Sequence, residues 1–201
     1  KDEEEIGYIE KACKITDACF SHLIDFIKIG MTEKEIAFEI EKFFIQNGAD
    51  GVAFETIVAS GKNSSKPHAV PTDKKIEAGD AITIDMGCKY KGYCSDMTRT
   101  IFAGYIPVKI REIYDLVLKN QFQALKEMHD GANAKIAARN VKNDFKLNNY
   151  DLVHSLGHGV GLDIHEKPFI SDRVDMILKE NMVVTDEPGI YLPGTYGVRI
   201  E

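Results

Sequence analysis

Two apolar segments of the chain each contain an acidic residue, and acidic residues in such surroundings can bind metal ions. Asp85 lies within residues 81–88 and Glu187 within residues 182–190, where Ile, Val and Met are frequent. Ionised carboxylates are seldom buried among apolar side chains unless a partner compensates their charge. These two positions are therefore the first candidates for a cation site.

The segment that contains Asp85 is predicted to form a hairpin with the segment that contains Asp96. A tight turn centred on residues 90–91 joins two strands, 81–88 and 93–102. In this register Asp85 lies directly opposite Asp96, and paired like charges destabilise a sheet unless they are neutralised. No Lys or Arg partner is evident on the same face, so the pair predicts a divalent cation.

A second predicted hairpin brings another pair of carboxylates together. It turns at residues 193–194 and places Glu187 opposite residues 199–201, which end in Glu201. Gly197 is expected to form a β-bulge that adjusts this register by one residue. The alternative, that both carboxylate pairs lie on solvated strand faces, is disfavoured by the apolar neighbours of these residues.

Histidines supply a further candidate ligand. Four of the six lie in or beside segments rich in Gly and Pro, whereas His22 and His129 are expected on helices as surface or core residues; the four are His68, His154, His158 and His165. Glycines on both sides of His158 give its backbone the freedom to approach a ligand closely. His158 therefore joins the carboxylates in the predicted metal site.

The predicted ligands are four carboxylates and one imidazole, namely Asp85, Asp96, His158, Glu187 and Glu201. A mixed oxygen and nitrogen set suits Mn²⁺, Co²⁺, Fe²⁺ or Zn²⁺ better than a metal selected by thiolates. One ion does not require so many anionic groups. Two ions about 3.5 to 4 Å apart are the arrangement that hydrolytic enzymes use.

Helices and strands must position these residues. Apolar spacing and end signals predict helices over residues 3–29, 32–47, 107–131 and 133–144. A strand is expected at 55–59, a long loop carrying His68 at 61–72, and a Gly-rich, strand-like region from residue 153 onward.

An internal repeat links the two acidic segments. The pattern Thr-x-Asp-x-Gly that ends at Gly87 matches the pattern Thr-x-Glu-x-Gly that ends at Gly189, at an offset of 102 residues. The match extends to Ile76 and Leu178, which lie at the same offset. This repeat predicts two related α+β halves that face one shared site.

Composition limits the classes of function. The chain has 201 residues, 44% of them hydrophobic, and a net charge of −7, which fits one globular domain and disfavours nucleic acid or an anionic membrane as partner. It contains no apolar run long enough to span a bilayer. The four cysteines lack C-x-x-C spacing, so free thiols in the cytoplasm are expected, although a disulfide between Cys88 and Cys94 is an alternative.

Six motifs carry a resemblance to a known family: KPHAVP at His68, TIDMG at Asp85, YCSDMTRT at Asp96, HSLGHGVGLDIHEKP at His158, TDEPGIY at Glu187 and VRIE at Glu201. Together they resemble the pita-bread metallopeptidases, which include methionine aminopeptidase, aminopeptidase P and prolidase. The resemblance implies an α+β fold of two pseudo-symmetric halves, with a curved antiparallel sheet covered by helices. It further implies that residues 1–201 form one catalytic domain, the C-terminal part of a longer homodimeric chain, truncated at its C-terminal end.

The resemblance also implies a role for each ligand. Asp85 would bind one ion, Asp96 and Glu201 would bridge both ions, and His158 with Glu187 would complete the second. A metal-bridging hydroxide would attack the peptide bond, and Glu187 would accept a proton from the attacking water.

The remaining histidines and one arginine are given roles by the same resemblance. His68 and His165 would contact the scissile carbonyl. His154 and Arg199 are similar to the pair found in aminopeptidase P and prolidase. This similarity implies hydrolysis of Xaa-Pro bonds with Mn²⁺ as the expected metal, and an added proton donor suits the tertiary amide of proline.

Three alternatives remain open at this stage. A methionine aminopeptidase would share the ligand set, a metal-free peptide-binding module would share the fold, and structural Ca²⁺ or Mg²⁺ would use the carboxylates alone. Asp186 departs from the family, which usually has an apolar residue at this position.

Overall fold

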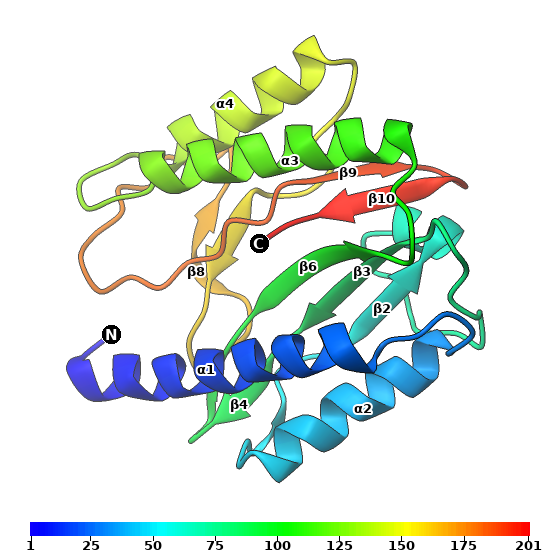
Figure 1. The fold of residues 1–201 in the computed structure, drawn as a ribbon. Coiled ribbons are helices and arrows are strands. Elements are labelled where there is room, and N and C mark those ends of the chain that lie inside the picture. The colour runs from blue at the N-terminus through cyan, green and yellow to red at the C-terminus, as the bar shows by residue number, and fades with distance from the viewer.

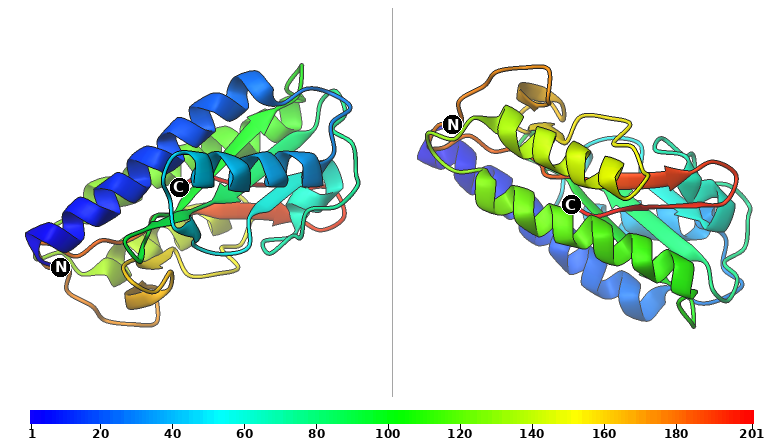
Figure 2. Two further views of the ribbon diagram at one scale, coloured as in Figure 1. Left: turned by 90° about the horizontal axis from the view of Figure 1, so that it is seen from below. Right: turned by 90° about the horizontal axis from the view of Figure 1, so that it is seen from above.

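Two pairs of helices lie on opposite sides of a set of strands in the computed structural model, which describes residues 1–201 (Figure 1). The helices are α1 (Glu3–Phe26), α2 (Glu33–Gln46), α3 (Val108–Glu127) and α4 (Ala134–Leu147). Views from below and above show α1 and α2 covering one side and α3 and α4 the other (Figure 2). The four predicted helices are confirmed, with ends that differ by a few residues.

The start of α2 illustrates how the sequence sets these ends. The Thr32 hydroxyl accepts a hydrogen bond from the Glu35 N–H at 3.1 Å, and the Glu35 carboxylate accepts one from the Thr32 N–H at 2.7 Å. This reciprocal pair is a capping box. His22 lies in α1, whereas His129 lies beyond the end of α3, so its predicted place on a helix is wrong.

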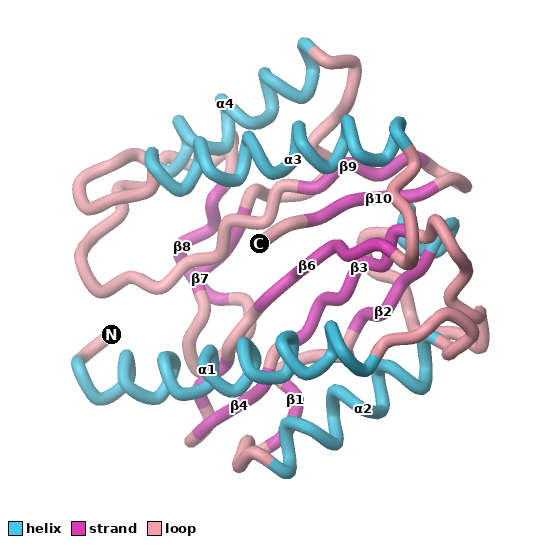
Figure 3. The backbone as a smooth tube through the Cα atoms, viewed as in Figure 1, coloured by secondary structure: helices cyan, strands magenta, loops and turns pink.

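Ten short strands and one 3₁₀ helix complete the fold (Figure 3). They are β1 (Gly51–Val52), β2 (Ile57–Ser60), η1 (Gly61–Ser65), β3 (Ala81–Met86), β4 (Cys88–Tyr90), β5 (Tyr93–Cys94), β6 (Met97–Phe102), β7 (Gly157–Gly159), β8 (Glu166–Ile170), β9 (Gly189–Leu192) and β10 (Tyr196–Arg199). All pairs are antiparallel and form four small sheets with the orders β1-β4-β5, β2-β3-β6, β7-β8 and β10-β9.

The register of the first hairpin differs from the prediction. Asp85 pairs with Thr98 rather than with Asp96. The hairpin closes on Lys91 and Gly92, both with positive φ, so its turn lies one residue later than expected. Asp96 lies two residues before Thr98, the residue that pairs with Asp85, so Asp96 is a diagonal neighbour of Asp85. This spacing keeps the two acidic side chains on the same face.

The second hairpin closes through residues 193–195, a loop one residue longer than the predicted turn, and it lacks the predicted bulge. Gly197 pairs regularly with Tyr191, and Gly189 pairs with Arg199. The same register carried beyond the strands brings Glu187 opposite Glu201. The predicted bulge at Gly197 is therefore wrong, and the predicted approach of the two glutamates is right.

Equivalent hydrogen bonds relate the two halves. The N–H groups of Gly30 and Gly131 donate to the carbonyls of Ile76 and Leu178, respectively, each at 2.9 Å. Gly79 and Asn181, which the repeat aligns, both have positive φ. Each half also has its own hydrophobic core, one beneath α1 and α2 and one beneath α3 and α4. The strands between these two cores position the site.

All four cysteines are free, so the alternative of a disulfide is not observed. None of the helices has the length and apolar character needed to cross a membrane.

Candidate metal centre and substrate cleft

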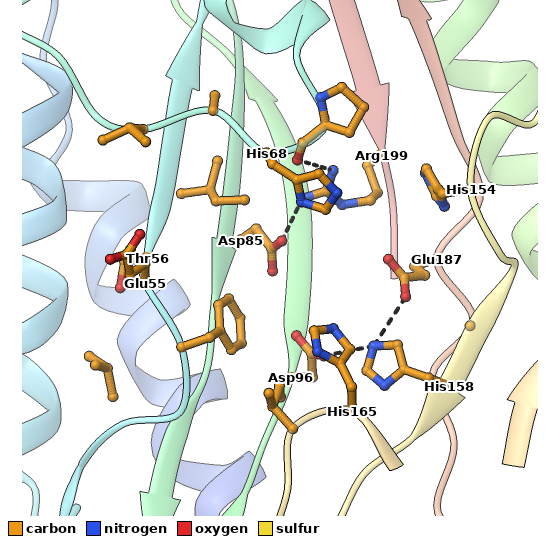
Figure 4. A pocket seen from close by; sticks show the side chains of 18 of the residues that line it. Glu55, Thr56, His68, Asp85, Asp96, His154, His158, His165, Glu187 and Arg199 are labelled. Atoms are coloured by element: carbon orange, nitrogen blue, oxygen red, sulfur yellow. Dashed lines mark hydrogen bonds and ion pairs between the residues drawn. The ribbon is translucent and has the colours of Figure 1, made fainter. Parts of the chain in front are cut away.

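A cleft of about 700 Å³ lies between the two halves, and most of the predicted site residues line it (Figure 4). They are His68, Asp85, Asp96, His154, His158, His165, Glu187 and Arg199. Glu201 reaches the same centre through its carboxylate. The structure thus brings together residues from strands and loops that are up to 133 positions apart.

Three carboxylates form the deepest part of the site. Single oxygens of Asp85, Asp96 and Glu201 all lie within 4.8 Å of one another. Burial raises the pKa of Asp96, and the charges of Asp85 and Glu187 raise it further. Burial also raises the pKa of Glu201, followed by the charge of Asp96. Such a cluster stores repulsion that divalent cations would relieve.

An unpaired oxygen supports the same interpretation. Oδ1 of Asp85 is buried and has no hydrogen-bond partner. Buried carboxylate oxygens are normally hydrogen-bonded or bound to metal. The three carboxylates therefore fit a divalent metal site by charge and by free coordination capacity.

His158, at the centre of β7, directs one ring nitrogen toward this cluster. Its Nε2 lies 3.2 Å from Oε1 of Glu187 and 3.5 Å from Oδ2 of Asp96. Its Nδ1 lies 3.1 Å from the carbonyl oxygen of Gly159. A proton on Nδ1 that bonds this carbonyl leaves the Nε2 lone pair free to bind a metal.

Glycine allows β7 to lie close to the segment before Glu187. A Cβ atom on Gly157 would clash with the carbonyl group of Thr185. The Thr185 N–H donates to the His158 carbonyl at 2.8 Å, and the Glu187 N–H donates to the Leu156 carbonyl at 2.8 Å. These bonds fix Glu187 beside His158.

The pKa of Glu187 differs in direction from those of the other carboxylates. Burial acts to raise this pKa, but the hydrogen bond with His158 and the charge of His154 lower it by more. Glu187 is consequently ionised more readily than Asp96 or Glu201, and it can accept a proton.

Arg199 contradicts the prediction that Asp85 has no basic partner. Its guanidinium forms an ion pair with Oδ2 of Asp85 and donates to the Thr98 hydroxyl at 3.0 Å and the Pro67 carbonyl at 3.1 Å. The side chain is only 4% exposed. Hairpin spacing could not reveal this partner because it comes from β10, in the other half.

Tyr191 is a site residue that the sequence analysis missed. Its hydroxyl accepts from Arg199 at 2.8 Å and lies 3.0 Å from Nε2 of His154, whose Nδ1 lies 2.7 Å from the Ser155 carbonyl. Burial lowers the pKa of His154. The alternation of side chains along a strand could have found Tyr191, because it shares a face with Glu187.

Two more histidines line the cleft near the carboxylates, namely His68 and His165. Figure 4 shows His68 next to Asp85 and His165 next to Asp96. The rings of His165 and His158 lie 4.4 Å apart in an edge-on arrangement. Burial and the nearby His158 lower the pKa of His165, which favours its neutral form.

The rest of the cleft has an apolar wall that comes from several segments. It includes Val52, Phe54, Ile57, Val70, Ile164 and Phe169. Val70 and Ile164 lie within the motifs at His68 and His158, whereas no motif contains the other four. A cleft of this size with polar groups at one end suits a small peptide.

Sequence comparison agrees with this geometry. Residues 7–201 match metallopeptidase family M24. The chain belongs to this family. It is 48% identical to the Xaa-Pro dipeptidase of Pyrococcus furiosus over 100% of this chain and 58% of that protein. A protein of Bacillus subtilis named as an uncharacterized peptidase is 44% identical over the same shares of each chain. The chain thus spans less than two thirds of these relatives.

Solved structures of similar proteins share the fold. Prolidase from Pyrococcus furiosus superposes with a TM-score of 0.97 at 47% identity, over 100% of this chain and 60% of that one. The X-Pro aminopeptidase of Thermotoga maritima gives 0.96 at 44% identity, over 100% and 57%. The predicted α+β pita-bread fold is confirmed.

Proposed function

We propose that this M24 chain belongs to a peptidase that hydrolyses Xaa-Pro bonds with the help of two divalent metal ions. The observation that carries this proposal is the convergence of four carboxylates and His158 at one end of a peptide-sized cleft. The names of the relatives support proline as the second residue of the substrate. Those names include both a dipeptidase and an aminopeptidase, so both a dipeptide and a longer peptide are candidate substrates.

The five predicted ligands would hold the metals, with Mn²⁺ the expected ion. They are Asp85, Asp96, His158, Glu187 and Glu201. When bound, such ions make water more acidic and stabilise negative charge on a peptide carbonyl. The buried and unpaired oxygen of Asp85 and the raised pKa values of Asp96 and Glu201 support this assignment.

The chain's own groups would then move protons and stabilise charge. Glu187 has the lowered pKa of a group that is ionised at neutral pH, and it would take the proton of the attacking water. His68 and His165 would donate hydrogen bonds to the oxygen of the scissile carbonyl as it becomes negative. A neutral imidazole can serve here because it still carries one N–H.

Proline specificity would come from the end of the cleft near His154. Tyr191 links His154 to Arg199, so these groups form one partly buried network beside the proposed metal ligands. The nitrogen of a proline peptide must gain a proton to leave, and a histidine is suited to that step. The apolar wall would receive the side chain before proline and the pyrrolidine ring.

The test uses the full-length protein with added Mn²⁺ and three substrates: an Xaa-Pro dipeptide, an Xaa-Pro tripeptide and a methionyl tripeptide without proline. We expect cleavage of at least one proline substrate and none of the methionyl peptide. Cleavage of the methionyl peptide alone would identify a methionine aminopeptidase instead. Elemental analysis should find two divalent ions per chain. If it finds no bound divalent metal, even after Mn²⁺ is added, a metal-free binding module is favoured.

Asp96→Asn is the matched variant. It keeps the shape of the side chain and removes the charge that two ions would share. We expect turnover to be lost while circular dichroism and the folded yield stay unchanged. Full activity in this variant would refute the assigned role of Asp96.

A further inference from the structure

Glu33, the first residue of α2, is fully buried with 0% exposure. No Lys, Arg or His forms an ion pair with it. A buried carboxylate without a counterion must be satisfied by hydrogen bonds. The groups that satisfy Glu33 all come from one distant segment of the chain.

This segment contacts Glu33 at both of its ends. Oε1 of Glu33 accepts from the Ser60 N–H at 2.7 Å and from its hydroxyl at 2.9 Å. Oε2 accepts from the Thr72 N–H at 3.0 Å and from its hydroxyl at 2.6 Å. The side-chain amide of Asn63 donates to both oxygens, at 3.1 and 3.0 Å. Six hydrogen bonds thus close the loop 61–72 at its base.

The far side of the loop is attached to the other half of the molecule. The hydroxyls of Ser64 and Ser65 accept from the N–H groups of Gly197 and Gly194, at 2.9 and 3.3 Å. His68 lies between these attachments and the Thr72 end, and it lines the cleft. The position of His68 therefore depends on the base of the loop.

Capping of α2 alone does not explain Glu33. A carboxylate in the first helical turn is favourable, but Thr32 and Glu35 already form the capping box. The first residue of α4, which is the equivalent helix of the other half, is Ala134. The shared scaffold thus does not require an acid at this position, whereas the loop that carries His68 does.

We propose that Glu33 is a positioning residue that holds His68 at the distance needed to bond the scissile carbonyl. The proposal rests on the function proposed above, in which His68 acts on that carbonyl. Small displacements of a group that stabilises charge reduce the rate strongly, while ground-state binding changes less. Glu33 should therefore affect kcat more than KM.

The decisive experiment is a double-mutant cycle in the full-length protein with Mn²⁺, using Glu33→Gln and His68→Ala. Gln keeps the shape of Glu33 but presents an NH₂ group to donors of the loop. We expect Glu33→Gln to lower kcat for an Xaa-Pro substrate by about 10- to 100-fold with KM changed less than about threefold. In the His68→Ala background, Glu33→Gln should lower kcat by no more than about twofold, because Glu33 acts through the contact that His68 makes with the scissile carbonyl. Equal losses in both backgrounds, or an unchanged kcat, would overturn the proposal.

Glu35→Gln is the matched control on the same helical turn. Its carboxylate bonds only the N–H and hydroxyl of Thr32 and does not reach the loop. We expect kcat to stay within about twofold of wild type. A loss as large as that of Glu33→Gln would assign the effect to α2 rather than to the loop, which would also overturn the proposal.

Hydrogen exchange separates this proposal from the proposed function. The amides of residues 61–72 should exchange faster in Glu33→Gln than in wild type, while those of α3 and α4 should not change. This result is expected even if no Xaa-Pro substrate is cleaved, and unchanged exchange would refute the role of Glu33. If Glu33→Gln does not fold, Asn63→Ala is the alternative variant, because it removes two of the six hydrogen bonds. It should show a smaller increase in the exchange of residues 61–72 and a smaller loss of kcat.

Discussion

Asp85 in the N-terminal half and Glu187 in the C-terminal half occupy equivalent positions of the repeat, yet their partners differ. Asp85 pairs with the guanidinium of Arg199, which comes from the opposite half. Glu187 contacts the imidazole of His158 in its own half. An arginine stays charged across the whole physiological pH range, whereas a histidine can release its proton. Asp85 is therefore held by a charge that does not titrate, although burial still raises the pKa of Asp85, whereas contact with His158 lowers the pKa of Glu187, the proposed base.

The largest expected effect comes from removing each of these carboxylates in turn. Asp85→Asn and Glu187→Gln should both lower kcat/KM by about 10³-fold or more at low Mn²⁺. High Mn²⁺ should restore part of the activity of Asp85→Asn only, because Glu187 is proposed to be a base as well as a ligand. A Mn²⁺ titration of kcat/KM measures this difference.

The remote carboxylate Asp144, which accepts from Asn120 and Lys119, supplies the control for these two variants. Asp144→Asn should leave kcat/KM near the wild-type value. Recovery of Glu187→Gln at high Mn²⁺ to the same extent as Asp85→Asn would contradict the assigned difference between the halves.

Asp186 marks a second difference, because the repeat aligns it with Ile84 in the core of the other half. Both Asp186 carboxyl oxygens are buried without partners, and burial raises the pKa of Asp186 to about 8. This folded-state pKa exceeds the unfolded value, so the folded protein binds more protons and loses stability as pH rises from about 4 to about 8. Asp186→Asn should raise the free energy of unfolding of the metal-free protein at pH 7 by up to about 4 kcal/mol, which is about 3 pKa units at 1.36 kcal/mol each.

Chemical denaturation at pH 5 and at pH 8, with a chelator present, measures this effect. The increase in the free energy of unfolding caused by Asp186→Asn should be larger at pH 8 than at pH 5. The exposed Asp17 on α1 is the control, and Asp17→Asn should have little effect at either pH. A gain that does not depend on pH would show that ionisation of Asp186 is not the cause.

Local patterns were sufficient to predict the helices and the candidate ligands. Helix spacing and the capping box at Thr32 depend on residues that are close in the chain. The repeat predicted that Asp85 and Glu187 face one site, because equivalent strands of two related halves meet at their shared interface. The carboxylates converge as predicted even though the register of the first hairpin differs from the predicted one.

Contacts between distant segments could not be predicted in the same way. The register depends on the turn at Lys91 and Gly92, and a turn of two residues can start at several places in this segment. The partner of Asp85 is 114 residues away, and Glu33 meets residues 27 to 39 positions away across a loop. No periodicity connects such residues, so only the three-dimensional structure shows them.

Arg199 joins the two halves directly, and its replacement should have an intermediate effect. Arg199→Lys keeps the charge, but one ammonium group cannot bond Asp85, Thr98, the Pro67 carbonyl and Tyr191 at once. We expect kcat/KM to fall about 10- to 100-fold at saturating Mn²⁺. Arg111→Lys, in an exposed pair with Asp115, should have no measurable effect. Wild-type activity in Arg199→Lys would show that charge alone holds Asp85.

The smallest effect is expected at the equivalent N-caps of α2 and α4, which are Thr32 and Asn133. Thr32 takes part in a reciprocal capping box, whereas the Asn133 side-chain oxygen only accepts from the Lys135 N–H at 3.0 Å. Thr32→Ala should lower the free energy of unfolding by about 1 kcal/mol and Asn133→Ala by somewhat less, as measured by urea denaturation. Thr32→Ala should in addition lower kcat slightly, because Glu33 follows it directly, while Asn133→Ala should not. Equal changes in kcat for both variants would mean that the two helices support the site alike, and the asymmetry assigned to the loop of His68 would then be wrong.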